Sequence, residues 1–237
     1  MKSINKLFLL LTVSFTFSSC SSQTKETLIS LEHAECLYEY VVRPYPEKGI
    51  VNLNDCEENW SWEINDGWNI CKEKGFAYKI EYTENNSHII NTFYSSSGSG
   101  EFTSLFFLET KENTFELIES IAEGDRCQHG LFSEDVELKN NMIYYSELIT
   151  PFHLMSWTGR DLPFDSYADC MVCCCGAAKY KYNPVSKKKE FIGIELLFDE
   201  FEGDNSFSKT YNSFIKQGKR ILDENDIKEF IKLVENK

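Results

Sequence analysis

The sequence predicts an α+β protein in which an antiparallel β-sandwich or partial barrel is followed by two C-terminal helices. Between residues 48 and 198, short runs of aromatic and β-branched residues are separated by polar turns, as in antiparallel sheets. Strands and helices do not alternate along the chain, which argues against a parallel α/β fold. After Gly203 the apolar residues change to a helical spacing. We therefore expect a single globular domain over residues 28–237.

Seven runs fit the strand pattern. They cover residues 76–82, 88–94, 102–108, 114–121, 142–149, 178–182 and 191–198. Turn-forming residues separate successive runs at 84–87, at the serine-glycine stretch 95–100 and at 183–186. These turns predict hairpins. Residues 28–42 fit a helix and a strand equally well.

Two amphipathic helices are predicted within residues 205–236. The apolar positions of the first are Phe207, Tyr211, Phe214 and Ile215, and those of the second are Ile227, Phe230, Ile231 and Val234. Gly218 ends the first helix, and Asp223 is the expected N-cap of the second. Both apolar stripes are expected to pack on the β-structure or on each other.

The first 19 residues have the anatomy of a secretory signal peptide. Lys2 and Lys6 precede a mainly apolar run over residues 7–17, and two serines follow it. These eleven residues, as a helix, rise about 16 Å at roughly 1.5 Å each, far short of the roughly 30 Å hydrocarbon core of a membrane. We expect residues 1–19 to be removed.

The segment Phe17-Ser18-Ser19-Cys20 resembles the lipobox of bacterial lipoproteins, in which small residues precede an acylated cysteine. The resemblance covers residues 1–20 and departs from the common pattern at Phe17, where leucine is usual. It implies a lipid-anchored envelope protein with Cys20 as the lipid-bearing first residue. Ser21 after it implies sorting to the outer membrane. Residues 20–27 hold no large apolar side chain and predict a flexible tether. The alternative is an ordinary secretory signal with a chance cysteine.

Composition narrows the classes of partner. Removing 19 of 237 residues leaves 218, which is enough for one domain with a real core. The signal holds two lysines and no acid, so the net charge changes from −14 to about −16. Such a charge argues against nucleic acid, because phosphate binding needs concentrated Lys and Arg. It favours a cationic protein or peptide as partner, with the lipid as the membrane contact.

Eight cysteines remain when Cys20 is set aside. They are Cys36, Cys56, Cys71, Cys127, Cys170, Cys173, Cys174 and Cys175. An even number in an exported protein predicts disulfides. One framework joins each cysteine of the 170–175 cluster to a dispersed one, since adjacent cysteines pair only through a strained ring. Another keeps Cys56 and Cys71 as a local bridge. At least two disulfides are expected to join the cluster to earlier cysteines.

A soft-metal site is the competing interpretation. Cys170 and Cys173 have CxxC spacing, and Cys127 lies near His129 in one loop; thiolates and imidazole suit zinc or cuprous copper. A second CxxC or an HxxxH, which would strengthen a zinc signature, is missing from the sequence. A thioredoxin-like redox motif lacks its βαβ context.

No Ser/His/Asp elbow, phosphate-binding glycine loop or HExxH motif occurs in the sequence. No catalytic residue is therefore predicted. Trp60, Trp62 and Trp68 suggest core packing, with a stacking platform for a glycan as the alternative. The first hypothesis is a non-enzymatic binding or structural module of the bacterial envelope. The alternative is a thiol-based metal-binding or redox-active envelope protein that uses the cysteine cluster.

Overall fold

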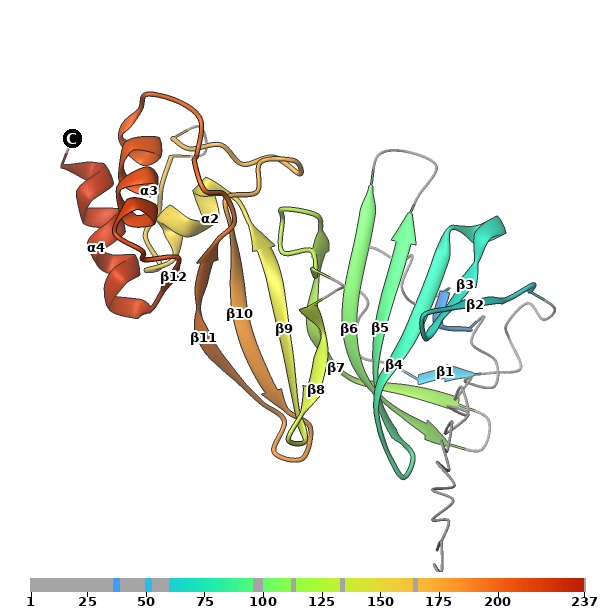
Figure 1. Cartoon of the computed structure of the whole chain (residues 1–237). Coiled ribbons are helices and arrows are strands. Elements are labelled where there is room, and N and C mark those ends of the chain that lie inside the picture. The colour runs from blue at the N-terminus through green and yellow to red at the C-terminus, as the bar shows by residue number, and fades with distance from the viewer. Residues whose placement is uncertain are drawn as a thin grey trace, which may run out of the picture.

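The computed structural model describes residues 36–38, 50–52, 60–95, 100–111, 114–132, 135–163 and 166–236. The expected signal peptide and tether, including Cys20, lie outside the described residues, and so does Cys56. The described chain forms two antiparallel sheets and a helical layer. Figure 1 shows the five-stranded sheet between the seven-stranded sheet and the C-terminal helices.

The seven-stranded sheet has the order β1-β7-β6-β5-β4-β3-β2. Its strands are β1 (Ile50–Asn52), β2 (Glu63–Asn65), β3 (Trp68–Cys71), β4 (Phe76–Glu84), β5 (Ser87–Ser95), β6 (Glu101–Lys111) and β7 (Thr114–Asp125). A short 3₁₀ turn, η2 (Lys72–Lys74), joins β3 to β4. Every neighbouring pair is antiparallel, so the long strands β4 to β7 form a meander.

The five-stranded sheet has the order β12-β11-β10-β9-β8. Its strands are β8 (Glu137–Lys139), β9 (Met142–Ile149), β10 (Gly176–Asn183), β11 (Lys188–Leu196) and β12 (Ile221–Leu222). Three helices accompany it: α2 (Pro151–Ser156), α3 (Ser206–Lys216) and α4 (Glu224–Glu235). None of the helices in the described ranges has the length and apolar character that crossing a bilayer demands.

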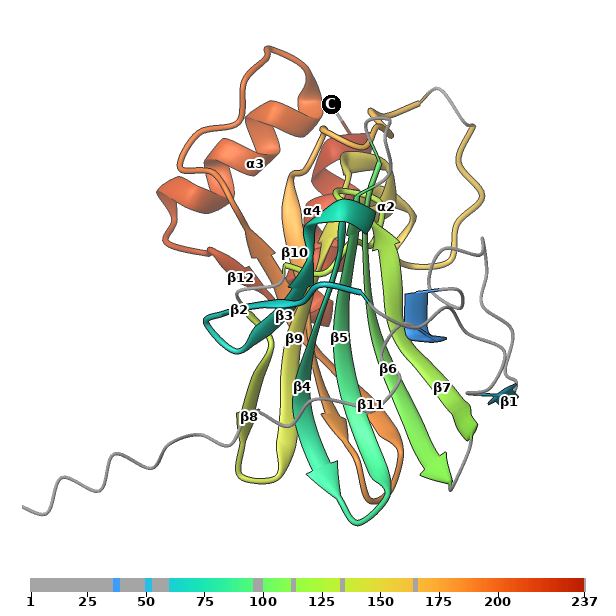
Figure 2. The same ribbon diagram turned by 90° about the vertical axis from the view of Figure 1, so that its right-hand side faces the viewer.

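The two sheets pack face to face around an inter-sheet core. Figure 2 shows β4 to β7 in front of β9 to β11. The buried apolar residues of this core are Ile89, Leu105, Phe107, Ile121, Ala122, Leu131, Val136, Ile143, Tyr145 and Tyr182. At its edge the Tyr182 hydroxyl donates a 2.8 Å hydrogen bond to the Glu119 carboxylate across the two sheets.

A second, helical core covers the other end of the five-stranded sheet. Its buried members are Ile149, Leu154, Met155, Cys175, Ala178, Ile194, Leu196, Phe207, Tyr211, Phe214, Leu222, Ile227, Phe230, Ile231 and Val234. Side chains two residues apart on a strand share a face. Along β10, Tyr182 belongs to the inter-sheet core, Ala178 belongs to the helical core, and Tyr180 packs against both. One apolar face of the five-stranded sheet therefore contributes to both the inter-sheet core and the helical core.

The tryptophans pack against an aromatic cluster on the seven-stranded sheet. Trp60 and Trp62 stack with ring centroids 5.8 Å apart, and Trp62 also meets the ring of Tyr78 at 5.3 Å. Both indoles cover a buried group that includes Cys36, Phe76 and Tyr78. The rings of Trp60 and Trp62 thus serve packing, as predicted. Trp68 begins β3 and is half-buried.

The structure confirms the predicted fold class and all seven predicted strands, most of which extend a few residues further. Of the two predicted architectures it is the sandwich, because the two sheets remain separate and do not close into a barrel. Both C-terminal helices form, and Asp223 caps α4 by accepting the N–H groups of Asn225 and Asp226. Of residues 28–42, only 36–38 are described, and they form one helical turn. The short elements β1, β2, β3, β8, β12 and α2 were not predicted.

Candidate functional site

The candidate site is a cysteine-rich loop region where the chain leaves β7 and where it enters β10. The first loop, residues 124–130, turns tightly on two glycines. A Cβ on Gly124 would lie 2.2 Å from the Gln128 carbonyl oxygen, and one on Gly130 would lie 2.4 Å from the Arg126 nitrogen. Only glycine leaves room for such close backbone approaches.

This first loop is fastened to the edge of β9. The His129 N–H donates to the Leu148 carbonyl oxygen at 2.9 Å, and the Leu148 N–H donates to the Gly130 carbonyl oxygen at 2.8 Å. Phe132 extends the pairing with a 3.0 Å bond to Ser146. The loop therefore carries Cys127 from the seven-stranded sheet to the five-stranded sheet.

Cys127 forms a disulfide with Cys174, which lies two residues before β10. The Cys127 backbone N–H also points to the Met171 carbonyl oxygen at 3.4 Å. The cysteines are 47 residues apart in sequence, and the bond joins the end of β7 to the start of β10. This disulfide is a covalent link between the two sheets.

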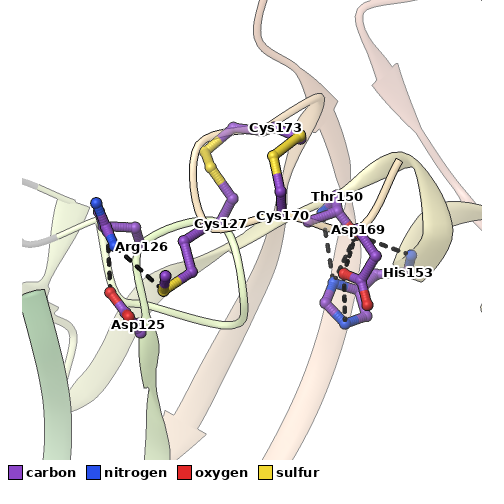
Figure 3. Close-up of a disulfide and its surroundings, with 10 residues drawn as sticks. Asp125, Arg126, Cys127, Thr150, His153, Asp169, Cys170 and Cys173 are labelled. Atoms are coloured by element: carbon purple, nitrogen blue, oxygen red, sulfur yellow. Dashed lines mark hydrogen bonds and ion pairs between the residues drawn. A yellow bond between two sulfur atoms is a disulfide. The ribbon is translucent and has the colours of Figure 1, made fainter. Parts of the chain in front are cut away.

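Cys170 and Cys173 form a second disulfide within one turn. The Cys173 N–H donates to the Cys170 carbonyl oxygen at 2.9 Å. Met171 and Val172 at the tip are exposed, Val172 by 76%. The Arg126 guanidinium lies 3.1 Å from the Met171 sulfur and is paired with Asp125 at 3.0 Å (Figure 3).

The predicted disulfide framework is wrong in two respects. Cys71 and Cys175 are free thiols, so the local Cys56–Cys71 bridge does not form. Of the four clustered cysteines, only Cys174 reaches an earlier cysteine, whereas at least two such links were expected. Cys36 is disulfide-bonded to a partner outside the described residues.

Both free thiols are buried. Cys71 ends β3 and is 1% exposed. Cys175 lies in the helical core, where burial raises the pKa of its thiol far above the usual range. A buried, protonated thiol behaves as a small apolar side chain and is unreactive. The sequence alone does not distinguish such packing cysteines from bridging ones.

The expected metal ligands do not form a metal site. Cys127, Cys170 and Cys173 are in disulfides, and such sulfurs are no longer the thiolates that bind zinc or copper. His129 instead lies with its Nδ1 3.4 Å from the Glu147 carboxylate. Across the described ranges, no three His, Cys, Asp or Glu side chains converge in a way that would hold a metal ion.

A histidine pair that was not predicted lies in this region. His153 occupies the third position of α2, where its Nδ1 accepts the Thr150 N–H at 3.4 Å and its own N–H points to the Thr150 hydroxyl at 3.3 Å. The Thr150 hydroxyl donates to the Asp169 carboxylate at 3.1 Å. The His153 Nε2 lies 4.0 Å from the same carboxylate. The ring of His129 is 4.3 Å from that of His153.

The environment favours the neutral form of His153. Burial lowers the pKa of His153, the neighbouring His129 lowers it further, and Asp169 partly opposes both effects. Glu147, which His129 contacts, is buried and also forms an ion pair with Lys189, whose Nζ is 2.7 Å from its carboxylate.

The residues around the histidine pair therefore combine a helix cap with an ion pair. The residues Thr150-Pro151 were the signal for this cap, since threonine is a good N-cap and proline suits the first helical position.

A separate hollow lies beside β8, away from the cysteines. Its volume is about 500 Å³, and it is lined by Asp135, Val136, Glu137, Lys139, Tyr144, Tyr145, Ser146, Lys179, Tyr180 and Ile192. Acidic, basic and aromatic side chains share the lining. This mixture does not select one class of ligand.

These features define a disulfide-linked α+β sandwich with a helical layer. Searches against family models, curated proteins and solved structures found no match to this chain. The function is therefore inferred from the residues of the site.

Proposed function

We propose that this chain is a lipid-anchored protein of the bacterial cell envelope, and that its body is a non-enzymatic binding or structural module. The observation that carries the proposal is the Cys127–Cys174 disulfide between the two sheets. Disulfides persist in exported proteins and are rare in the reducing cytosol. The pairing thus agrees with the signal-like residues 1–19 and with lipid attachment at Cys20.

The use that the fold makes of its histidines supports a structural or binding role. His88 lies between Thr83, at 3.1 Å, and Thr110, at 3.3 Å, and so joins β4, β5 and β6. His153 caps α2. His129 faces Glu147. Each of these three rings is engaged in holding elements together.

The charge of the body indicates the kind of partner. The net charge is about −16 after removal of the signal. This charge favours a cationic protein or peptide as the partner, with the lipid supplying the membrane contact. A glycan is the alternative partner, and nucleic acid is not expected. Ser21 after the acylated cysteine suggests the outer membrane.

Replacing the acylated cysteine tests the anchor. In a bacterial host, the full chain is expected in the membrane fraction, and Cys20→Ser is expected either to leave the membrane or to retain residues 1–19. Ser22→Ala, within the expected tether, is the matched control and is expected to fractionate as the parent does. A Cys20→Ser protein that is cleaved normally and remains in the membrane fraction would contradict the proposal.

A further inference from the structure

The two disulfides differ in their surroundings. Cys127 is 2% exposed, so one sulfur of the Cys127–Cys174 bond is shielded from solvent. Cys170 and Cys173 are both half-buried and lie on either side of the exposed Met171 and Val172. Thiol–disulfide exchange requires an approaching thiolate to reach a sulfur atom. Both cysteines of the Cys170–Cys173 bond are thus partly exposed, whereas in the other bond only Cys174 is.

The disulfides also differ in what they hold. The Cys127–Cys174 bond closes a loop of 47 residues between the two sheets, whereas Cys170 and Cys173 are three residues apart. The entropy that a cross-link removes from the unfolded chain grows with the length of the loop. The short bond therefore contributes less to the stability of the fold.

The turn that carries the short disulfide has other supports. The Cys173 N–H to Cys170 carbonyl bond closes it, and the Cys127 N–H contacts the Met171 carbonyl oxygen. Arg126 contacts the Met171 sulfur. We expect these contacts, with Cys174 fixed to Cys127, to retain the turn when the Cys170–Cys173 bond is open.

We propose that Cys170–Cys173 is an exchangeable disulfide that accepts two electrons from an external dithiol, while Cys127–Cys174 is the structural link. A thiolate of the dithiol attacks one sulfur of the pair, the Cys170–Cys173 bond breaks, and the other cysteine sulfur leaves with the electron pair and takes up a proton. The second thiol of the partner then attacks the mixed disulfide. The products are the oxidised partner and two cysteine thiols, and the reverse sequence reoxidises the pair.

The partner that fits this turn is a protein that presents a dithiol beside an apolar surface. Met171 and Val172 project between the two cysteines and offer an apolar contact. Cys175 takes no part, because its thiol is buried in the helical core. The exchange therefore involves one pair of sulfurs only.

Reduction under native conditions tests the inference. The full chain, purified without reductant, is treated with dithiothreitol at neutral pH, quenched with acid, alkylated and mapped by mass spectrometry. The thiols of Cys170 and Cys173 are expected to appear at least ten times faster than those of Cys127 and Cys174. The melting temperature is expected to fall less after this first reduction than after reduction of both bonds. Equal rates, the reverse order, or reduction only in denaturant would overturn the inference.

Two variants separate accessibility from folding. The Cys173→Ser variant leaves a thiol at Cys170, which iodoacetamide is expected to alkylate at least ten times faster than Cys175 in the same molecule. The double variant Cys170→Ser/Cys173→Ser is the matched control and is expected to melt cooperatively and to consume no dithiol under conditions that reduce the parent. A Cys170 thiol as slow as Cys175 would also overturn the inference.

The inference rests on the oxidised state that the proposed function assumes. Different results would contradict the proposed function and the exchangeable disulfide. If protein taken from the envelope had free thiols at all four clustered cysteines, the proposed function would lose its support. If both disulfides were present but reacted at the same rate, only the exchangeable pair would be contradicted.

Discussion

The hydroxyl of Tyr211 donates a 3.0 Å hydrogen bond to the carbonyl oxygen of Cys175. The same hydroxyl accepts the N–H of Phe198 at 2.9 Å. Tyr211 lies on α3, Cys175 precedes β10, and Phe198 follows β11. One buried hydroxyl therefore ties the helical layer to two strand ends, directly beside the loop that carries both disulfides.

Removing this hydroxyl is expected to destabilise the protein. Tyr211→Phe leaves the Phe198 N–H without its partner, whereas the Cys175 carbonyl keeps the Leu197 N–H at 3.3 Å. A buried polar group that loses its partner costs about 1–3 kcal/mol. Urea denaturation measures the change in the free energy of unfolding. Tyr167→Phe, at a half-buried tyrosine of the same layer, is the control and is expected to change it less. Equal effects would show that the Tyr211 hydroxyl has no special role.

The cap of α4 offers a second test. The Asp223 side chain accepts the N–H groups of Asn225 and Asp226, which have no partner within the helix. Asp223→Ala is expected to lower the free energy of unfolding by about 0.5–2 kcal/mol. Glu200→Ala, at an exposed site outside the helices, is expected to change it by less than about 0.5 kcal/mol. A cap variant as stable as this control would count against the assigned cap.

The histidine pair predicts how stability depends on pH. Burial and His129 lower the pKa of His153 in the folded protein, and Asp169 partly opposes them. Near pH 6 the unfolded chain therefore binds more protons at this residue than the folded chain does. Stability from this group is fully present above pH of about 6.5 and is lost as the pH falls from there through the folded pKa. Protonation also removes the Nδ1 acceptor used by the Thr150 N–H.

Denaturation at a series of pH values checks this prediction. Between pH 7 and 5 the free energy of unfolding is expected to fall less steeply in His153→Asn than in the parent, by at most about 1.4 kcal/mol per pH unit. His88, whose pKa burial also lowers, keeps its own contribution in both proteins. Identical slopes would mean that His153 does not titrate as described.

The two disulfides are expected to differ in their contributions to stability. Cys127→Ser/Cys174→Ser removes the link between the sheets and is expected to cost about 2–4 kcal/mol. Cys170→Ser/Cys173→Ser removes a bond between cysteines only three residues apart. It is expected to lower the free energy of unfolding by about 2 kcal/mol less than the first double variant does. Chemical denaturation of both double variants gives the comparison. A larger loss from the second pair would reverse the assignment of the structural bond.

The longer elements were predictable because their patterns are local. The run 142–149 corresponds to β9 without any shift of its ends, and the stripe containing Phe230 corresponds to the buried face of α4. The hairpin of β2 and β3 was missed although Asp66-Gly67 is a strong turn signal, with φ of 47° and 81°. Its strands of three and four residues are too short to show a period.

The site was predictable in composition but not in connection. The cysteine cluster was found from the sequence, yet Cys127 meets Cys174 only because the loop 124–130 pairs with β9. That pairing depends on contacts between segments far apart in the chain. The prediction that clustered cysteines pair only with distant ones was also wrong for Cys170 and Cys173, because a local turn brings these two together. His153 and Asp169 are 16 residues apart and meet for the same long-range reason.

Peptide mapping of protein isolated from the bacterial envelope, alkylated before any reductant is added, tests the central claim most directly. The proposed function predicts one cross-linked species, in which the peptide with Cys127 is joined to Cys174 of a second peptide that also carries the internal Cys170–Cys173 bond. Cys71 and Cys175 are expected to be alkylated only after denaturation, because both thiols are buried. Native protein in which Cys127, Cys170, Cys173 and Cys174 were all alkylated at once would contradict an oxidised, exported body.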